Sequence, residues 1–234
     1  MTKSIPIFIV NFNRLISLRN LITILRNRNY DNIIVIDNKS TYGPLLEYYD
    51  TFKSCPSVNI YYMTENKGPY VLNELLLKGE FPGILEDYYV YTDSDIVPIE
   101  DIPYNFIEDL VSICEFHKVD KVGLSLKIDD LPDHYNRKEE VINWESSHWK
   151  TNGLYNGIVL YDAPIDTTFS ICAPNIKCSW ASNAIRTGLP YMARHIPWYV
   201  NSNNLPDDEQ YMRDEIQKNM GKEGVHQTYH WSTK

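Results

Sequence analysis

The sequence lacks the features that would direct it to a nucleic acid or into a membrane. Acidic residues outnumber basic ones by 31 to 22, the formal net charge is −9, and no basic cluster offsets this excess. The chain therefore has no surface suited to neutralising the phosphates of DNA or RNA. No apolar stretch approaches the ~18 residues of a membrane span, and no signal-like segment with a small-residue cleavage site follows Met1. We expect a soluble, cytoplasmic protein.

The cysteine patterns of zinc sites are also absent. The four cysteines are Cys55, Cys114, Cys172 and Cys178. They form no Cys-X-X-Cys pair, and no histidine lies at zinc spacing from them. We interpret all four as reduced thiols in or near the core, as is usual in a reducing compartment.

What the chain does contain is enough apolar residues for a substantial core. Hydrophobic residues make up 43% of its 234 positions, and this length favours one domain with an irregular appendage. Five apolar runs lie at 5–10, 32–38, 58–63, 88–98 and 121–127. Helical patterns separate them, most clearly at 15–28 and at about 103–116. The alternation predicts an α/β fold with a mainly parallel sheet and helices on both faces.

The pattern changes after residue 128. The stretch 129–149 is polar and aromatic, and a helix is expected from 206 to about 220. Shorter strands of mixed direction are expected at 155–161, 167–172 and 181–186. We predict one domain over 1–234, with a sheet-forming half at 1–127 and a smaller mixed region at 128–234.

Polar residues collect at the C-terminal ends of the first four predicted strands. They are Asn11, Asn13, Arg14, Asp37, Asn38, Asn66, Lys67, Asp93 and Asp95, and Phe12 and Ser94 lie within these strings. In an open α/β sheet such ends line one crevice, where these folds bind ligands. The pattern predicts a nucleotide-sized site, in which Asp37 accepts hydrogen bonds from a base or ribose.

Asp93-Ser94-Asp95 follows the fourth strand directly. If the extended backbone persists through Ser94, both carboxylates project from the same side of the chain. Paired carboxylates suit Mg²⁺ or Mn²⁺, which can bridge the oxygens of a diphosphate. A bare Asp-X-Asp is more often only a polar strand end. Its placement beside three other polar strand ends favours the metal site.

These motifs, in this order, resemble the nucleotide-sugar half of GT-A glycosyltransferases, especially glycosyltransferase family 2. The strings that carry the likeness lie at 9–14, 34–38, 66–68 and 92–95, within the first 127 residues. Further strings at 131–135, 144–145, 161–169 and 193–199 resemble a subgroup of bacterial and large-virus glycosyltransferases.

The resemblance implies transfer of a sugar from a nucleoside diphosphate, in the first place UDP, to a hydroxyl of a carbohydrate acceptor bound by the second half. It places Asp37 near the uracil with Asn66 and Lys67 beside it. The donor-binding candidates also include Phe12, Asn13, Arg14, Asp93 and Ser94. This assignment gives the first half of the chain to the donor.

The resemblance also implies a bound Mn²⁺ or Mg²⁺. Asp95 is its expected ligand, and Asp93 contacts the ribose or shares the metal through water. GT-A enzymes commonly complete the metal shell with a histidine late in the chain, which His195 matches. His226 and His230 compete for this role from the polar tail.

An inverting transfer needs a carboxylate that takes the proton of the acceptor hydroxyl. Asp166 is the first candidate, because it lies between the Asp-X-Asp and His195, in the order expected of a GT-A base. Glu145 is the second, followed by Asp133 and Asp208. The Trp-containing Glu-Asp motif of many family-2 enzymes is not found, and a retaining enzyme would need no base here. Both stereochemical outcomes stay open.

Three other functions compete. A sugar-phosphate nucleotidyltransferase usually carries a glycine-rich basic loop after its first strand, but residues 11–14 contain no glycine. A phosphatase with an aspartyl nucleophile would carry its Asp-X-Asp after the first strand instead of the fourth. A non-catalytic nucleotide- or glycan-binding module is the non-enzyme alternative, and the intact carboxylates count against it.

Overall fold

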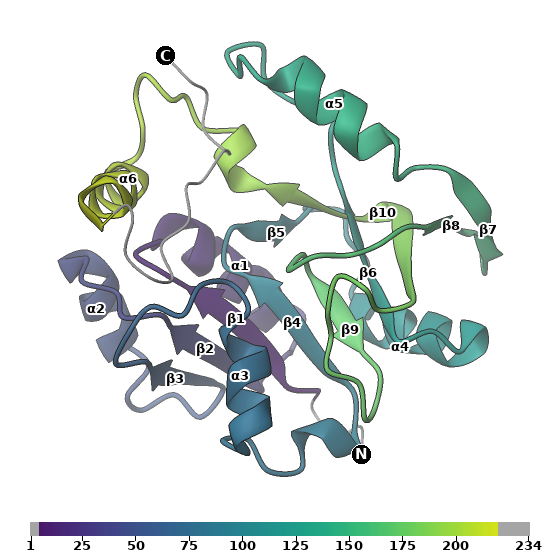
Figure 1. Cartoon of the computed structure of the whole chain (residues 1–234), viewed down its shortest axis with the longest axis horizontal. Helices are drawn as coiled ribbons and strands as arrows, with labels where there is room; N and C mark the ends of the chain where they lie inside the picture. Colours follow the sequence, from purple (N-terminus) through teal and green to yellow (C-terminus); the bar gives the residue numbers. More distant parts are fainter. Residues whose placement is uncertain (1–4, 220–234) are drawn as a thin grey trace.

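A computed structural model of the chain describes residues 5–219, which form a ten-stranded sheet with helices packed on it (Figure 1). The strands are β1 (Ile7–Asn11), β2 (Ile33–Asp37), β3 (Val58–Tyr62), β4 (Tyr89–Asp93), β5 (Ile96–Pro98), β6 (Lys121–Leu126), β7 (Thr151–Tyr155), β8 (Ile158–Asp162), β9 (Ser170–Cys172) and β10 (Ala184–His195). The helices are α1 (Ile16–Arg26), α2 (Gly43–Asp50), α3 (Val71–Lys78), α4 (Phe106–His117), α5 (Lys138–Ser146) and α6 (Asp207–Asn219).

The strand order is β3-β2-β1-β4-β9-β6-β10-β8-β7, and β5 pairs with β10. The neighbours from β3 to β4 are parallel, as are β6 and β10, whereas β9 lies antiparallel between β4 and β6. In the register, Asn11 lies opposite Asp37 and Val10 opposite Asp93, so three strands end at one edge of the sheet. This confirms the predicted α/β class with a mostly parallel central sheet.

The alternation of side chains along β1 explains why helices cover both faces of the sheet. Ile7 and Ile9 belong to a large core that includes the buried sides of α1 and α4. Phe8 and Val10 point the other way into a smaller core with the apolar face of α3. Figure 1 shows α3 in front of the sheet and α1 behind it.

The second half differs from the expectation in its details. The predicted strand at 155–161 is a hairpin, in which Asn156 and Gly157 turn between β7 and β8 with φ of 48° and 85°. An Asn-Gly pair favours this turn because both positions need a positive φ. The strand expected at 181–186 runs on to His195, and α5 forms where only a polar, aromatic stretch had been noted.

The expectation of four reduced thiols is wrong for two of them. Cys172 ends β9, and the loop that follows returns Cys178 to a Cα–Cα distance of 6.0 Å, so that the two form a disulfide. Both half-cystines are buried, while Cys55 and Cys114 are free thiols. Such a pairing depends on the path of the loop, which cysteine spacing alone does not reveal.

Helix α6 is fastened to the start of α1. Asp208 Oδ2 accepts hydrogen bonds from the backbone N–H groups of Leu15 and Ile16, at 2.8 and 2.7 Å. Unpaired N–H groups at a helix N-terminus favour such a carboxylate. Within residues 5–219, none of the helices combines the length and apolar character needed to cross a membrane.

Candidate functional site

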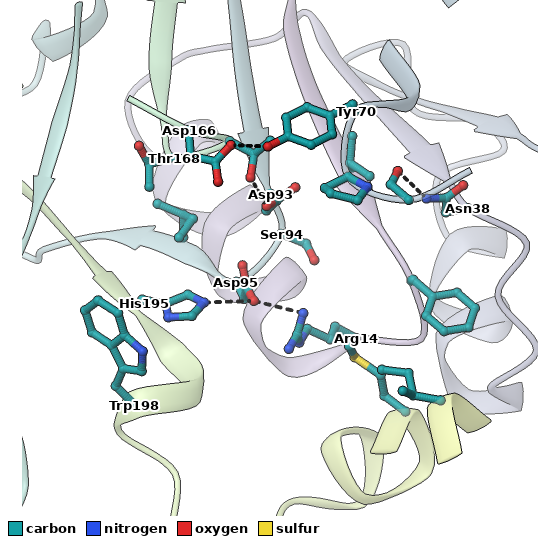
Figure 2. A pocket seen from close by; sticks show the side chains of 18 of the residues that line it. Arg14, Asn38, Tyr70, Asp93, Ser94, Asp95, Asp166, Thr168, His195 and Trp198 are labelled. Carbon is teal, nitrogen blue, oxygen red and sulfur yellow. Dashed lines mark hydrogen bonds and ion pairs between the residues drawn. The ribbon is translucent and has the colours of Figure 1, made fainter. Parts of the chain in front are cut away.

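A cavity of about 1170 Å³ opens at the edge where the parallel strands end. Its lining includes Arg14 after β1, Asn38 after β2 and Asn66 after β3, together with Asp93 and Asp95 at the end of β4. Figure 2 shows several of these side chains around one space. The predicted convergence of polar strand ends is therefore found, although not every predicted residue takes part.

The Asp-X-Asp does not continue as an extended strand. β4 ends at Asp93, a turn occupies Ser94 and Asp95, and β5 begins at Ile96. The Ser94 N–H donates to the Val10 carbonyl at 3.0 Å, which ties the turn to β1. The two carboxylates remain close enough that burial, followed by the charge of Asp95, raises the pKa of Asp93 well above its ordinary value.

Arg14 is the cation of this cluster. Its Nη1 lies 2.8 Å from Asp95 Oδ2, and its Nε lies 2.7 Å from Glu209 Oε1 on α6. Burial alone would lower the pKa of the guanidinium, but the two carboxylates outweigh it and raise that pKa above its ordinary value. Arg14 therefore links Asp95 to α6.

His195 reaches the same carboxylate from a strand one hundred residues further along the chain. β5 pairs with β10 so that His195 lies opposite Ile96, the residue after Asp95, and the Ile196 N–H donates to the Asp95 carbonyl at 2.9 Å. His195 Nε2 lies 3.4 Å from Asp95 Oδ2 (Figure 2). Trp198 packs edge-to-face on the imidazole, with ring centroids 4.7 Å apart.

The donor set fits a hard divalent cation in chemistry, although it is not arranged as a finished site. Among residues 5–219, no three His, Cys, Asp or Glu side chains converge as metal ligands, because Asp93 accepts a hydrogen bond from Thr167 while Asp95 faces Arg14 and His195. Two buried carboxylates that repel one another gain from a shared divalent cation. Asp93, Asp95 and His195 would hold it.

Asp166 lines the cavity and faces Tyr70, whose hydroxyl donates to Asp166 Oδ1 at 2.6 Å (Figure 2). The backbone before it is held by two buried cations. Lys121 Nζ donates to the carbonyls of Ile165 and Asp166 at 3.1 and 2.7 Å, and Arg186 Nε donates to the carbonyl of Pro164 at 2.8 Å. Burial lowers the pKa of Lys121 to about 8. Three consecutive carbonyls thus fix where Asp166 projects.

Glu145 also lines the cavity, but it belongs to an ion pair. Its Oε2 lies 2.9 Å from Nη1 of Arg186, and both side chains are almost fully buried. Burial is the main cause that lowers the pKa of Arg186, and the Glu145 charge opposes it. Asp166 and Glu145 are the first two candidates for the base. Within the described residues, Glu145 pairs with a guanidinium and Asp166 does not.

Other predicted residues support the wall of the cavity from behind. Asp37 accepts hydrogen bonds from the Ser40 N–H at 2.9 Å and the Tyr49 hydroxyl at 3.0 Å, and burial raises its pKa. Asn13, with φ of 55°, accepts from the N–H groups of Thr41 and Tyr42 through Oδ1. Asp37 and Asn13 are outside the cavity lining, and so is Lys67, which pairs with Glu65.

The remaining candidate residues also divide into those that line the cavity and those that do not. Phe12 and Ser94 line the cavity. Asp133 is fully exposed and pairs with Lys138, and Asp208 binds the start of α1. His226 and His230 lie outside the described residues. The cavity lining also includes residues that were not predicted as site residues, namely Thr41, Tyr70, Trp144, Thr168, Trp180 and Arg186. Trp144 and Thr168 lie in strings that carry the family resemblance, and Arg186 is a charge inside a predicted strand.

No family model and no curated protein matches this sequence. Among solved structures, the chain is similar to a mannosyltransferase from Pyrobaculum calidifontis in complex with GDP-Man and Mn²⁺. The TM-score is 0.50 at 11% identity, over 93% of this chain and 70% of that one. The chain thus shares the fold of a GT-A-type glycosyltransferase, and identity this low extends the likeness to the fold alone.

Two weaker likenesses are to GalNAc-T7 and to a UDP-glucose pyrophosphorylase. GalNAc-T7 with UDP, GalNAc and Mn²⁺ gives a TM-score of 0.39 at 16% identity, over 53% of this chain and 23% of that one. Apo UDP-glucose pyrophosphorylase gives 0.43 at 9% identity, over 90% and 99%. Likenesses this weak assign no reaction to this chain.

Proposed function

We propose that this protein is a metal-dependent glycosyltransferase that moves a sugar from a nucleoside diphosphate, in the first place UDP, to a hydroxyl of a carbohydrate. The observation that carries the proposal is the placement of Asp95, which lies between Arg14 and His195 in a large cavity at the ends of parallel strands. Such a cluster of buried charges in a cleft is typical of a functional site.

In this proposal the donor binds across the strand ends. Asn38 and Asn66, with Thr41, line the part of the cavity next to β2 and β3, where a nucleoside would lie. Arg14 Nη2 and Thr168 Oγ1 are buried polar atoms that lack a hydrogen-bond partner in the described part of the chain. A bound diphosphate sugar would satisfy such groups, which are costly when left unpaired.

A divalent cation held by Asp93, Asp95 and His195 would neutralise the charge that develops on the departing diphosphate. Arg14 supports this arrangement through its ion pair with Asp95, which positions that carboxylate. Metal dependence, family-2 membership and the choice of UDP remain parts of the proposal, supported by the residues named above and by their resemblance to GT-A motifs.

Asp166 is our proposed base for an inverting reaction. It would take the proton of the acceptor hydroxyl while that oxygen forms a bond to the anomeric carbon, and the bond from this carbon to the diphosphate breaks with its electron pair. The Tyr70 hydroxyl orients the carboxylate. Glu145 is the weaker choice, because its charge is matched by Arg186. The donor would occupy residues 1–127 and the acceptor 128–234 of one domain.

The test is a panel of nucleotide sugars incubated with and without Mn²⁺, with nucleoside diphosphate release as the readout. We expect release from at least one donor, UDP-sugars first, and its loss after exhaustive chelation. Full activity in the chelated protein would remove the metal from the proposal. Release of pyrophosphate from a nucleoside triphosphate and a sugar phosphate would instead identify a nucleotidyltransferase, and no turnover of any donor would identify a binding module.

A further inference from the structure

The cavity is larger than a donor site needs. Its volume of about 1170 Å³ exceeds the ~300–1,000 Å³ that is usual for one ligand. The sheet order also gives it two ends. Asn38 and Asn66 follow β2 and β3 on one side of the Asp-X-Asp, whereas Leu126 and Arg186 belong to β6 and β10 on the other side. The second end is available for a second ligand.

Helix α5 forms the wall of this second end. Arg137 at its N-cap, then Glu140, Val141, Trp144 and Glu145 all line the cavity. These positions are spaced by three and four residues, so they occupy one face of the helix. Figure 1 shows α5 at the top of the molecule, well separated from α6 and α2 on the left. One whole helix face is therefore turned to the cavity at a distance from the nucleoside end.

Trp144 gives this end an aromatic surface. Trp144 is 61% exposed although it lines the cavity, and it meets His148 at a ring-centroid distance of 5.6 Å and an angle of 85°. Trp180, 45% exposed, also lines the cavity, but Asn73 on α3 holds its loop through a hydrogen bond from Nδ2 to the Cys178 carbonyl at 2.9 Å, so it is not assigned to this end. Exposed indole rings that are positioned by neighbours can stack against the C–H faces of sugar rings.

The charges at this end are matched in pairs. Arg137 Nε lies 2.9 Å from Glu140 Oε2, and Arg186 Nη1 lies 2.9 Å from Glu145 Oε2. Each cation is thus balanced by a carboxylate, which leaves no net charge to attract a phosphate, a sulfate or a carboxylated sugar. Paired carboxylate and guanidinium groups still provide acceptors and donors for hydroxyl groups.

We infer that the cavity-facing side of α5, with Trp144 as its aromatic platform, is a subsite for a neutral oligosaccharide. Under the proposed function this oligosaccharide is the acceptor, and the inference rests on that function in this respect. An uncharged pyranose ring stacks on Trp144, and its hydroxyl groups bond to the ion pairs beneath it.

The experiment presents the full chain, with UDP and Mn²⁺, to an array of neutral, sialylated and sulfated oligosaccharides. We expect retention on neutral glycans, and a weakening of about tenfold or more in Trp144→Ala, because a central aromatic platform is lost. Trp144→Phe should keep part of the affinity. The matched control is Phe116→Ala, which removes an aromatic side chain that is 69% exposed on α4, outside the cavity lining.

Unchanged retention in Trp144→Ala, preference for the charged glycans, or no retention of any glycan would each overturn the inference. Hydrolysis of the nucleotide sugar by water, without any glycan, separates this result from the proposed function. If hydrolysis is absent while Trp144-dependent glycan binding is present, the transferase proposal fails and the subsite stands. If the wild type and Trp144→Ala hydrolyse the nucleotide sugar equally and retain glycans equally, only the subsite inference fails.

Discussion

The two ends of the cavity are built by different means. At the donor end, the backbone places the side chains, because Arg14, Asn38 and Asp93 follow neighbouring parallel strands in register. At the α5 end, buried side chains place the backbone, as Lys121 and Arg186 do when they donate to the carbonyls of residues 164–166. The first kind of site follows from strand order. The second depends on single contacts between residues far apart in the sequence. A substitution away from the ligand should therefore disturb it more readily.

The largest effect is expected from Asp166→Asn. A general base typically contributes about 10²–10⁴-fold to the rate, so glycosyl transfer should fall by that factor while the affinity for donor and metal stays near normal. Titration calorimetry with the nucleoside diphosphate and Mn²⁺, beside a turnover assay, measures both. If donor binding collapsed as well, Asp166 would be structural.

Glu145→Gln is the matched control at the same end. It leaves buried Arg186 without its counter-charge, so we expect a loss of about 3–5 kcal/mol in the free energy of unfolding. Because the Arg186–Glu145 pair also belongs to the inferred acceptor subsite, the KM for the acceptor should rise, whereas transfer per folded molecule at saturating acceptor should stay within a few fold of the wild type. A pure loss of turnover at unchanged stability would move the role of base from Asp166 to Glu145.

Asp95→Asn tests the donor end and should have the next largest effect. Loss of one electrostatic stabiliser costs roughly 10²–10³ in rate. Here the substitution also removes the negative charge that Arg14 and His195 face. The dependence of turnover on Mn²⁺ concentration measures the effect. Asp133→Asn, at an exposed ion pair, is the control and should behave like the wild type. An Asp95→Asn protein with full activity would contradict the metal assignment.

Cys172→Ser tests whether the loop bearing Trp180 needs its covalent tie. Opening so short a loop should cost about 2 kcal/mol in the free energy of unfolding. The unfolding midpoint in denaturant measures the loss. Cys55→Ser, at a free thiol, should cost much less. Equal stability of the wild type with and without reductant would show that the disulfide contributes nothing.

The smallest effect, taken per pH unit, is a pH dependence of the free energy of unfolding that comes from Lys121. Its pKa falls from 10.5 to about 8 in the folded protein, so between these pH values the unfolded chain binds the extra proton. Its contribution therefore makes stability rise with pH across this window, by no more than about 1.4 kcal/mol per pH unit. We expect the free energy of unfolding, measured with denaturant from pH 8 to 10.5, to rise less or fall more with pH in Lys121→Met than in the wild type. Parallel curves for the two proteins would contradict the depressed pKa.

The contrast between the two ends also explains what could be predicted from the sequence. Buried apolar strands and their polar ends are local patterns, so the sheet, the crevice and the position of Asp95 followed from them. A strand end does not fix the direction of its side chain, however. Asp37 follows the same logic as Asp93, yet it turns to Tyr49 because a buried hydroxyl is available there.

The α5 end offered no such pattern. The face of α5 that lines the cavity consists mostly of charged and aromatic residues, so a search for apolar periodicity misses it. The Arg186–Glu145 pair and the Cys172–Cys178 bond join residues whose proximity depends on the finished fold. His195 is the instructive exception. Its distance to Asp95 depends on the pairing of β5 with β10, and only the motif order of a known family indicated it.

Arg14 couples the Asp95 carboxylate to helix α6. The same guanidinium contacts Asp95 at the strand end and Glu209 on α6. A cation that competes with Arg14 for Asp95 changes how strongly Arg14 holds Glu209, and so changes the free energy that keeps α6 against the sheet. Such coupling is reciprocal. Substitutions that loosen α6 must therefore alter the affinity for that cation by the same factor, although no residue of the cation site has changed.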